Sequence, residues 1–211
     1  MKPLVIVGAG GHGKVIADLA RLVGYEIAGF VDVARIGEVA EPGGAKVVMT
    51  QQDFLAQAAA GQPLSNDVTI AIGNNAVRLE LFYELRRHVN LPTLVHPTAW
   101  LSSHVEIGLG THVCPMVVVH PGAWVGQASI LNTRCVVEHD CVVGDGVHVS
   151  PGAVLCGGVN VGDGAWIGAG AVVIPGVRIG ANAIVGAGSV VIRDVAEGQK
   201  VVGNPARLLA T

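Results

Sequence analysis

The chain has 211 residues, of which 51% are hydrophobic, 14% are charged and 4% are aromatic. Such a composition excludes an intrinsically disordered chain, and a net charge of -3 without a basic run argues against nucleic acid as a partner. The longest apolar stretch, residues 165–177, is interrupted by Gly and Pro and is too short to cross a bilayer, so no membrane segment is expected.

The cysteines and the N-terminus predict a cytoplasmic protein. Residues 1–7 lead directly into a glycine loop and are too short for a signal peptide. The cysteines show no CxxC spacing, which favours reduced thiols over a disulfide framework. No pair among the eight histidines has metal-ligand spacing, so we predict no metal site.

The first 97 residues alternate between strand and helix patterns. The expected elements are, in chain order, strand 4–10, helix 11–24, strand 26–32, strand 46–49, helix 52–60, strand 67–73, helix 75–89 and strand 93–97. Alternation at these lengths indicates a parallel sheet with right-handed crossovers. We therefore predict a Rossmann-like α/β domain over residues 1–97.

A glycine loop follows the first strand of this domain. Residues 8–13, Gly-Ala-Gly-Gly-His-Gly, satisfy GxGxxG, and Asp32 ends the second strand. Glycines at a helix N-terminus let backbone N–H groups approach a phosphate, and the carboxylate can accept from a ribose or a base. A lone GxGxxG is a weak signal, and a ligand-free tight turn remains an alternative. The nucleotide-binding candidates are Gly10, Gly11, His12, Gly13, Asp32 and, after another strand at the same sheet edge, Gly73, Asn74 and Asn75.

The second half repeats with a period of six. From Leu101 to Val191 every sixth residue is Leu, Ile or Val, in sixteen consecutive hexads without an insertion. The position four residues further on is small or β-branched almost throughout. A hexapeptide period predicts a parallel β-helix with coils of 18 residues, in which residue i stacks on residue i+18. We assign this β-helix, with a C-terminal tail, to residues 98–211.

Several motifs together resemble a known family. They are GAGGHGKV near the start, AIGNN at 71–75, HPTA at 96–99, ILNTRCVVEHDC at 130–141, HVSPGA at 148–153 and the ending VVGNPARLL. In combination they are similar to the hexapeptide-repeat sugar acetyltransferases typified by bacillosamine and perosamine N-acetyltransferases and by sialic acid O-acetyltransferases. The resemblance implies a left-handed β-helix, acetyl-CoA as co-substrate, and a homotrimer with active sites between subunits.

The sequence Glu138-His139-Asp140 is the expected catalytic group. The hexad frame places His139 on the surface of a coil, where its stacking neighbours Pro121 and Gly157 cannot cover it. Spacing alone allows a solvated polar corner, but the resemblance implies that this histidine is the general base. The resemblance also favours Asp140 over Glu138 as its supporting carboxylate. Because consecutive strand residues point to opposite sides, that support requires a bend here or a carboxylate from another chain.

Coenzyme A requires groups that hold its arm and phosphates. The resemblance places the histidine of HVS near the thioester, so His148 is a candidate contact. Backbone amides at glycine-rich corners complete the expected set, in which the cofactor-binding candidates are His148, Gly157, Ala169 and Ala187. Asn132 is expected to orient the sugar. Cys135 and Cys141 occupy small inward positions, which argues against a cysteine nucleophile.

The predicted activity is acetyl-CoA-dependent N-acetylation of the 4-amino group of a nucleotide-linked 4-amino-4,6-dideoxy sugar, by direct attack. Two alternatives stay open, namely sugar O-acetylation on the same scaffold and a non-catalytic β-helix scaffold. The choice between a UDP- and a GDP-linked sugar is also open, because the loop over residues 32–45 has no readable code for the base.

Overall fold

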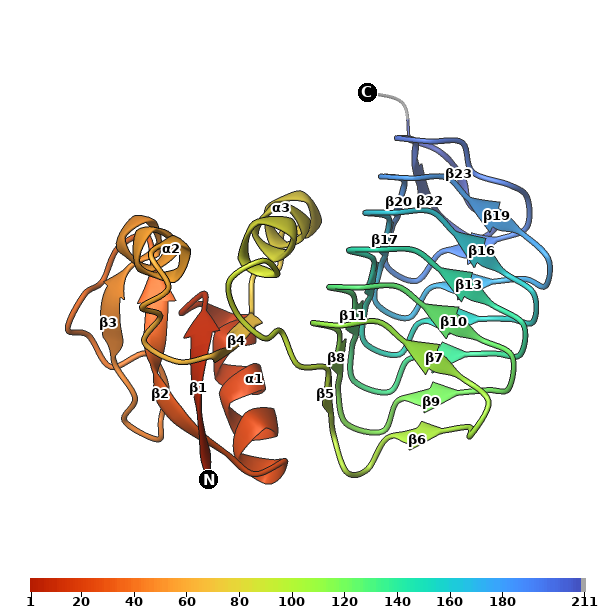
Figure 1. Ribbon diagram of the computed structural model, residues 1–211. Coiled ribbons are helices and arrows are strands. Elements are labelled where there is room, and N and C mark those ends of the chain that lie inside the picture. The colour runs from red at the N-terminus through yellow and green to blue at the C-terminus, as the bar shows by residue number, and fades with distance from the viewer. Residues whose placement is uncertain (210–211) are drawn as a thin grey trace. The chain divides into compact units, whose positions relative to one another are not determined.

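The computed structural model describes residues 1–209 and divides the chain into two compact units, Met1–Leu94 and the part from Val95 onward (Figure 1). Within the described residues, no helix has the length and apolar character needed to cross a membrane.

The first unit is an α/β domain. Its elements are β1 (Lys2–Val7), α1 (Gly11–Leu22), β2 (Tyr25–Asp32), β3 (Val47–Thr50), α2 (Gln51–Ala59), β4 (Asp67–Ile70) and α3 (Asn75–Leu85). The strands form a parallel sheet in the order β3-β2-β1-β4. The last four residues of β1 are fully or almost fully buried, because both faces of a parallel sheet are covered. The predicted α/β architecture is therefore confirmed.

The glycine loop depends on close packing between β1 and α1. Gly13, in the first turn of α1, lies against the carbonyl oxygen of Gly8, so closely that a side chain at position 13 would collide with it. Ile16 and Ala20 of α1 pack into the core beside Phe30 of β2. The helix N-terminus is thereby fixed at the carboxyl edge of the sheet.

One predicted strand belongs elsewhere. We expected residues 93–97 to extend the α/β sheet, but β5 (Leu94–Val95) pairs with β8 (His112–Val113) in a sheet of the β-helix. The N–H of His96 donates to the carbonyl of Val113. The strand was assigned from its position after a helix, and that pattern carries no information on which sheet edge is free.

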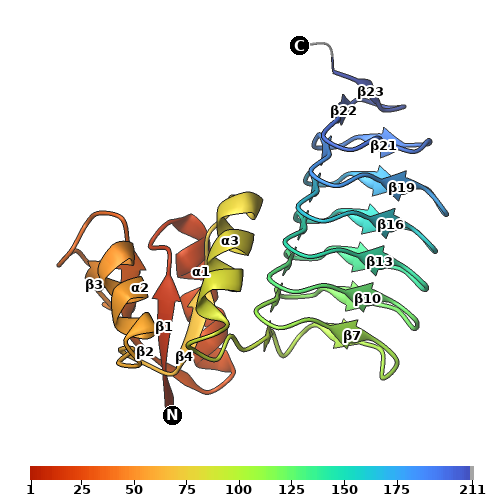
Figure 2. The same cartoon turned by 45° about the horizontal axis from the view of Figure 1, so that its top comes forward.

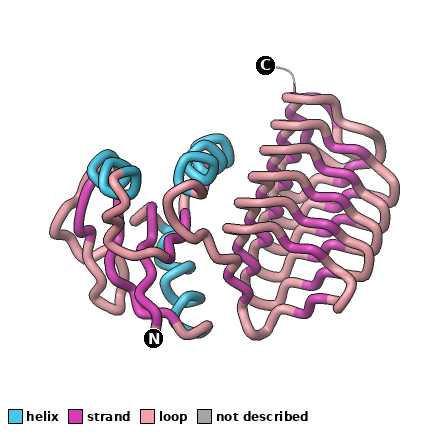
Figure 3. Tube along the Cα trace, viewed as in Figure 1, coloured by secondary structure: helices cyan, strands magenta, loops and turns pink. Residues whose placement is uncertain are grey.

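The second unit is the expected parallel β-helix. Sixteen two-residue strands, β6 to β21, follow one another within the described chain and stack into three sheets (Figures 1 and 2). Figure 3 shows how the short strands alternate with turns around each coil. Their bounds are Trp100–Leu101, Glu106–Ile107, His112–Val113, Val118–Val119, Trp124–Val125, Ile130–Leu131, Val136–Val137, Val142–Val143, His148–Val149, Val154–Leu155, Asn160–Val161, Trp166–Ile167, Val172–Val173, Arg178–Ile179, Ile184–Val185 and Val190–Val191.

The register confirms the 18-residue coil. Val137 pairs with Val119 on one side and with Leu155 on the other. The aliphatic residue of each strand points inward, and together with the small residues, Cys135 and Ala153 among them, it forms one continuous core. Two further strands, β22 (Lys200–Val202) and β23 (Arg207–Leu208), pair antiparallel at the C-terminal end.

The β-helix has three faces, each defined by its strands. Face 1 carries β5, β8, β11, β14, β17 and β20, with β22 and β23 at its C-terminal end. Face 2 carries β6, β9, β12, β15, β18 and β21. Face 3 carries β7, β10, β13, β16 and β19. The chain passes from face 1 to face 2 through corners such as 132–135, and from face 2 to face 3 through corners such as 138–141.

Candidate active site

His139 and Asp140 occupy the turn between β12 and β13. Asp140 has φ of 59°, a left-handed conformation that reverses the alternation of side chains. The Nδ1 atom of His139 lies 2.9 Å from Oδ2 of Asp140, and the two side chains are 63% and 73% exposed. Of the two arrangements that the sequence left open, the structure has the bend, so one chain supplies both members of the pair.

Two glycines make room for this pair. A Cβ atom at Gly157, one coil further on, would lie 2.5 Å from Nε2 of His139. A Cβ atom at Gly122, in the preceding coil, would lie 2.5 Å from Oδ1 of Asp140. The imidazole therefore rests over the backbone of Gly157, and no side chain could be added there without moving the ring.

The carboxylate beside the ring favours its protonated form. The hydrogen bond to Asp140 raises the pKa of His139 above its ordinary value, burial opposes this, and the charges of Asp140 and Glu138 add to the increase. Glu138 lies on the other side of the turn, with Oε1 3.7 Å from Nε2 of His120. Asp140, and not Glu138, is thus the carboxylate in contact with His139.

The other predicted acetyl-CoA and sugar contacts lie at a different corner. His148, on the outer side of face 1, has Nε2 3.1 Å from Nδ2 of Asn132, and its ring stacks on Trp166 with centroids 5.8 Å apart. Ala169 and Ala187 are exposed at the corner between faces 1 and 2. Face 2 separates all four of these residues from His139 and Gly157.

Backbone N–H groups are available at both corners. The N–H of Gly157 has no acceptor among residues 1–209. The same holds, within that described range, for the N–H groups of Ala169 and Ala187. Amides left without a partner at exposed turns are donors for the phosphates or carbonyl oxygens of a ligand.

The cysteines have the environment of packed side chains. Cys114, Cys135 and Cys141 are fully buried. Burial raises the pKa of the Cys114 thiol to about 11 and raises the pKa values of Cys135 and Cys141 as well. Cys156 is partly buried, and its pKa is also raised, first by desolvation. Such thiols are poor nucleophiles.

The two glycine-containing loops of the α/β unit meet at one sheet edge. The carbonyl of Val7 accepts from the N–H of Ala71, and a Cβ atom at Gly8 would lie 2.8 Å from the carbonyl oxygen of Ala71. Residues 10–13 and 73–75 therefore stand side by side at the carboxyl ends of β1 and β4. Ligands of open parallel sheets bind at this edge.

Asp32 is part of the loop's own structure. Its Oδ2 atom accepts from the N–H of Ala9 at 2.7 Å, and Oδ1 lies 3.4 Å from the N–H of Ala34. The guanidinium of Arg35 donates to the carbonyl oxygen of Ala9 at 3.2 Å. Asp32 thus fixes the glycine loop, and a carboxylate oxygen has further lone pairs with which to accept from a ribose.

A buried arginine escaped the sequence reasoning. Arg78 is fully buried in α3, and its guanidinium contacts the loop that contains Gly73 and Asn75. The signal was present: positions 78, 81, 82 and 85 form the buried stripe of α3, and arginine occupies the first of them. Burial, with a smaller contribution from the charge of Arg78, lowers the pKa of His12 to about 4. His12 is therefore neutral at physiological pH.

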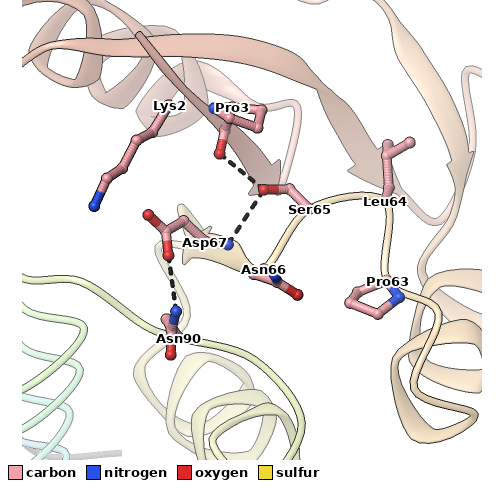
Figure 4. Close-up of a pocket in the computed structure, with 8 residues that line it drawn as sticks. All are labelled: Lys2, Pro3, Pro63, Leu64, Ser65, Asn66, Asp67 and Asn90. Atoms are coloured by element: carbon pink, nitrogen blue, oxygen red, sulfur yellow. Dashed lines mark hydrogen bonds between the residues drawn. The ribbon is translucent and has the colours of Figure 1, made fainter.

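The pocket shown in Figure 4 lies elsewhere in the α/β unit. It measures about 460 Å³ and is lined by Lys2, Pro3, Pro63, Leu64, Ser65, Asn66, Asp67 and Asn90. Lys2 and Asp67 begin β1 and β4, so this hollow is at the amino edge of the sheet, opposite the glycine loops. Ser65 and Asn90 close it with hydrogen bonds to Pro3 and Asp67. It is not the predicted nucleotide site.

Potential metal ligands are dispersed. Within residues 1–209, no three His, Cys, Asp or Glu side chains are grouped so that they could hold a metal ion.

Comparison with protein families matches both units. The model described as the PglD N-terminal domain matches residues 3–85, and the bacterial transferase hexapeptide model, of six repeats, matches residues 158–193. Among curated proteins, GDP-perosamine N-acetyltransferase of Escherichia coli O157:H7 is 38% identical over 85 residues. That match covers 40% of this chain and 38% of the curated protein, so it spans well under half the length of that relative.

Solved structures match over the full length. The acetyltransferase domain of PglB from Neisseria gonorrhoeae FA1090 is 37% identical, with a TM-score of 0.91 over 99% of this chain and 100% of that one. PerB from Caulobacter crescentus, solved with CoA and GDP-perosamine, is 37% identical with a TM-score of 0.90 over 100% and 98%. Two variants of the Caulobacter enzyme, with one histidine replaced by Asn or Ala, were solved with the same two ligands.

These similarities fix the class of protein. The fold is an α/β domain followed by a left-handed β-helix of hexapeptide repeats, as the sequence predicted. This is the fold of the hexapeptide-repeat acyltransferases. More narrowly, the chain belongs to the hexapeptide-repeat family of amino-sugar N-acetyltransferases that includes PglB and PerB.

Proposed function

We propose that this protein transfers the acetyl group of acetyl-CoA to the 4-amino group of a UDP- or GDP-linked 4-amino-4,6-dideoxy sugar, with His139 as general base. The observation that carries the proposal is the exposed His139–Asp140 pair over Gly157, in a chain that matches PerB, solved with CoA and GDP-perosamine, over 98% of that chain. We assign nucleotide-sugar binding to residues 1–97 and acetyl transfer to residues 98–211.

The chemistry follows from the orientation of the imidazole. Asp140 accepts a hydrogen bond from the Nδ1–H of His139, which leaves the lone pair on Nε2, facing the backbone of Gly157 and open to solvent. Acetyl-CoA supplies the thioester carbonyl. As the acceptor nitrogen forms its bond to the carbonyl carbon, Nε2 takes the nitrogen's proton, and the resulting imidazolium is stabilised by Asp140. That proton can then pass to the departing sulfur.

Backbone amides suit the remaining demands of the reaction. The N–H of Gly157, beside the imidazole, is positioned to bind the thioester end of the co-substrate. We assign the amides of Ala169 and Ala187 as further donors along its path, and His148 as a contact near the thioester. Direct transfer without an acyl-enzyme is favoured because the cysteines are buried or have a raised pKa.

The acceptor's nucleotide fits the edge formed by the two glycine-containing loops. Gly10, Gly11 and Gly13 form the N-terminal end of α1, where backbone N–H groups can approach a phosphate. Neutral His12 can donate or accept one hydrogen bond at the same place. Asp32 is available to the ribose, and residues 73–75 face the same edge. Asn132 is the candidate that orients the sugar.

A homotrimer would unite the two corners. His139 and Gly157 lie at one edge of face 2, whereas Asn132, Ala169 and Ala187 lie at its other edge, next to His148 on face 1. The outer side of face 2 carries a stripe of half-buried valines, namely Val118, Val136, Val154, Val172 and Val190. Burying that stripe against neighbouring copies would bring the His139 corner of one chain to the other corner of the next. The setting we propose is cytoplasmic polysaccharide biosynthesis.

The test is release of free thiol from acetyl-CoA in the presence of a panel of acceptors. We expect release with a UDP- or GDP-linked 4-amino-4,6-dideoxy sugar and none with the corresponding 4-hydroxy compounds. Release only with hydroxyl acceptors would replace N-acetylation by O-acetylation. Absence of release with every acceptor, from a protein that is folded by circular dichroism, would leave a non-catalytic scaffold.

A further inference from the structure

The guanidinium of Arg78 lies entirely inside the α/β unit, where a charge must be held by hydrogen bonds. Its Nη1 atom donates to the carbonyl oxygen of Ile72 at 2.9 Å and lies 3.4 Å from that of Gly73. Its Nη2 atom donates to Oδ1 of Asn75 at 2.8 Å. Burial lowers the pKa of Arg78 to about 10, so the group stays protonated near neutral pH. These three acceptors belong to one four-residue turn.

These contacts determine which way the turn presents its amides. In a trans peptide the carbonyl and the following N–H point in opposite directions. With the carbonyls of Ile72 and Gly73 directed at Arg78, the N–H groups of Gly73 and Asn74 point away from it. Neither N–H has an acceptor in the part of the chain that the structure describes. Both residues are exposed, and a Cβ atom at Gly73 would meet no atom within 4 Å.

The turn stands where a ligand of the glycine loop would lie. Gly8 is in contact with Ala71 and Ile72, so residues 72–75 lie next to the GxGxxG loop at the carboxyl edge of the sheet. Asn74 caps α3 by accepting from the N–H of Val77 at 3.1 Å. The N-terminus of α3 therefore adds its dipole at the point where the two free amides emerge.

We propose that Arg78 is a positioning residue for nucleotide binding, one that holds the turn Ile72–Asn75 with its Gly73 and Asn74 amides directed at a phosphate of the nucleoside diphosphate. This inference rests on the proposed function of the α/β unit. A purely structural role for Arg78 makes a different prediction. In that case, replacing the arginine would lower folding stability but leave the affinity of the folded protein for nucleotide unchanged.

The experiment compares Arg78→Met and Arg78→Lys with a matched control, Arg87→Met. Arg87 is exposed just beyond the C-terminal end of the same helix. The dissociation constants of UDP, GDP and CoA are measured by calorimetry for the full chain, alongside thermal melting. We expect Arg78→Met to weaken binding of the preferred nucleotide about 10- to 100-fold and Arg78→Lys to weaken it less, because lysine restores the charge but cannot span the three acceptors.

The controls separate the possible outcomes. The affinity for CoA and the behaviour of Arg87→Met should stay at wild-type values. A folded Arg78→Met protein with wild-type nucleotide affinity would overturn the inference. Should the methionine variant fail to fold, Arg78→Lys decides: tighter or unchanged binding contradicts the proposal, and weaker binding supports it. A wild-type protein that binds neither UDP nor GDP would instead refute the nucleotide-binding role of this unit.

Discussion

At the scale of single residues, the proposed reaction depends on where one imidazole is held. The side chain of His139 is 63% exposed, and its position comes from the hydrogen bond to Asp140 on one side and the bare backbone of Gly157 on the other. The left-handed turn at Asp140 could not be read from the sequence, because non-glycine residues adopt it rarely. That turn is why Asp140, an immediate neighbour in the chain, can reach Nδ1.

Replacing Gly157 with Ala tests the role of the missing side chain. The added Cβ would lie 2.5 Å from Nε2 of His139, so the ring must rotate away, whereas the backbone at position 157 is not in the left-handed region. We expect kcat to fall by about 100-fold with only a small change in melting temperature. Steady-state kinetics and thermal melting measure the two effects. Unchanged kcat would show that the ring is not needed in this place.

Replacing Asp140 with Asn tests the electrostatics. A base must be neutral to act, so activity is lost as pH falls through the pKa of His139, which Asp140 raises. Asparagine removes most of that increase. We expect the acidic limb of the kcat/KM profile, measured over about pH 5 to 9, to move to lower pH while the plateau falls about 10- to 100-fold. A limb that stays in place would mean that another group titrates.

At the scale of elements, one turn of the α/β unit depends on the buried carboxylate of Glu41 and its ion pair with the partly exposed Arg21. The Glu41 carboxylate, 1% exposed, accepts from both Nη atoms of Arg21 and from the N–H groups of Gly43 and Ala45. These hydrogen bonds, that to Arg21 first, lower the pKa of Glu41 to about 2. Because the folded pKa is below the unfolded value, the stabilisation is present above about pH 4.5 and is lost as pH falls toward 2.

We expect Glu41→Gln to lower the free energy of unfolding of this unit by about 2 to 3 kcal/mol near neutral pH. The deficit should shrink as pH falls from about 4.5 toward 2, because the wild-type carboxyl then protonates. Urea unfolding followed by far-ultraviolet circular dichroism, which reports on α1, α2 and α3, gives both numbers. The exposed pair Arg35–Glu38 offers a control, since Glu38→Gln should cost less than about 1 kcal/mol. Equal losses in the two variants would contradict the account.

The elements also show what the sequence could and could not predict. The hexad period determined every coil, since each inward position must be aliphatic whatever the tertiary context. The GxGxxG loop and helix α1 were equally readable. The placement of β5 in the β-helix could not be predicted from the sequence, because the partner of a strand depends on which sheet edge is free. The burial of Arg78 was not predicted. A charged residue at the first position of an apolar helical stripe is readily interpreted as an exposed residue beside that stripe.

At the scale of the whole molecule, the sequence motifs located candidate residues but not how they combine. His139 lies at the corner between faces 2 and 3, whereas His148 lies on β14 of face 1, so the two side chains project from different sides of the coil. In the proposed homotrimer, each chain would contribute two half-sites to different active sites. The sequence holds no direct signal for this division, because the period is the same on every face.

Mixed assemblies test the shared site. Chains with His139→Ala lack the base, and chains with Ala169→Trp have a blocked corner, so each should be inactive alone. In trimers formed from both variants, a site is intact when the Ala169→Trp chain supplies His139 and the His139→Ala chain supplies Ala169. We expect activity at roughly a quarter of the sites after random assembly. Mixtures without activity would place the complete site within one chain.

The most direct test of the central claim is the turnover number of His139→Ala with acetyl-CoA and the preferred amino-sugar nucleotide. Loss of the base should lower kcat by about 100- to 10,000-fold while the dissociation constants of CoA and nucleotide stay near wild type. The exposed His88, in the α/β unit, supplies the matched control, and His88→Ala should retain full activity. A folded His139→Ala enzyme with wild-type kcat would contradict the account, because another group would then remove the proton.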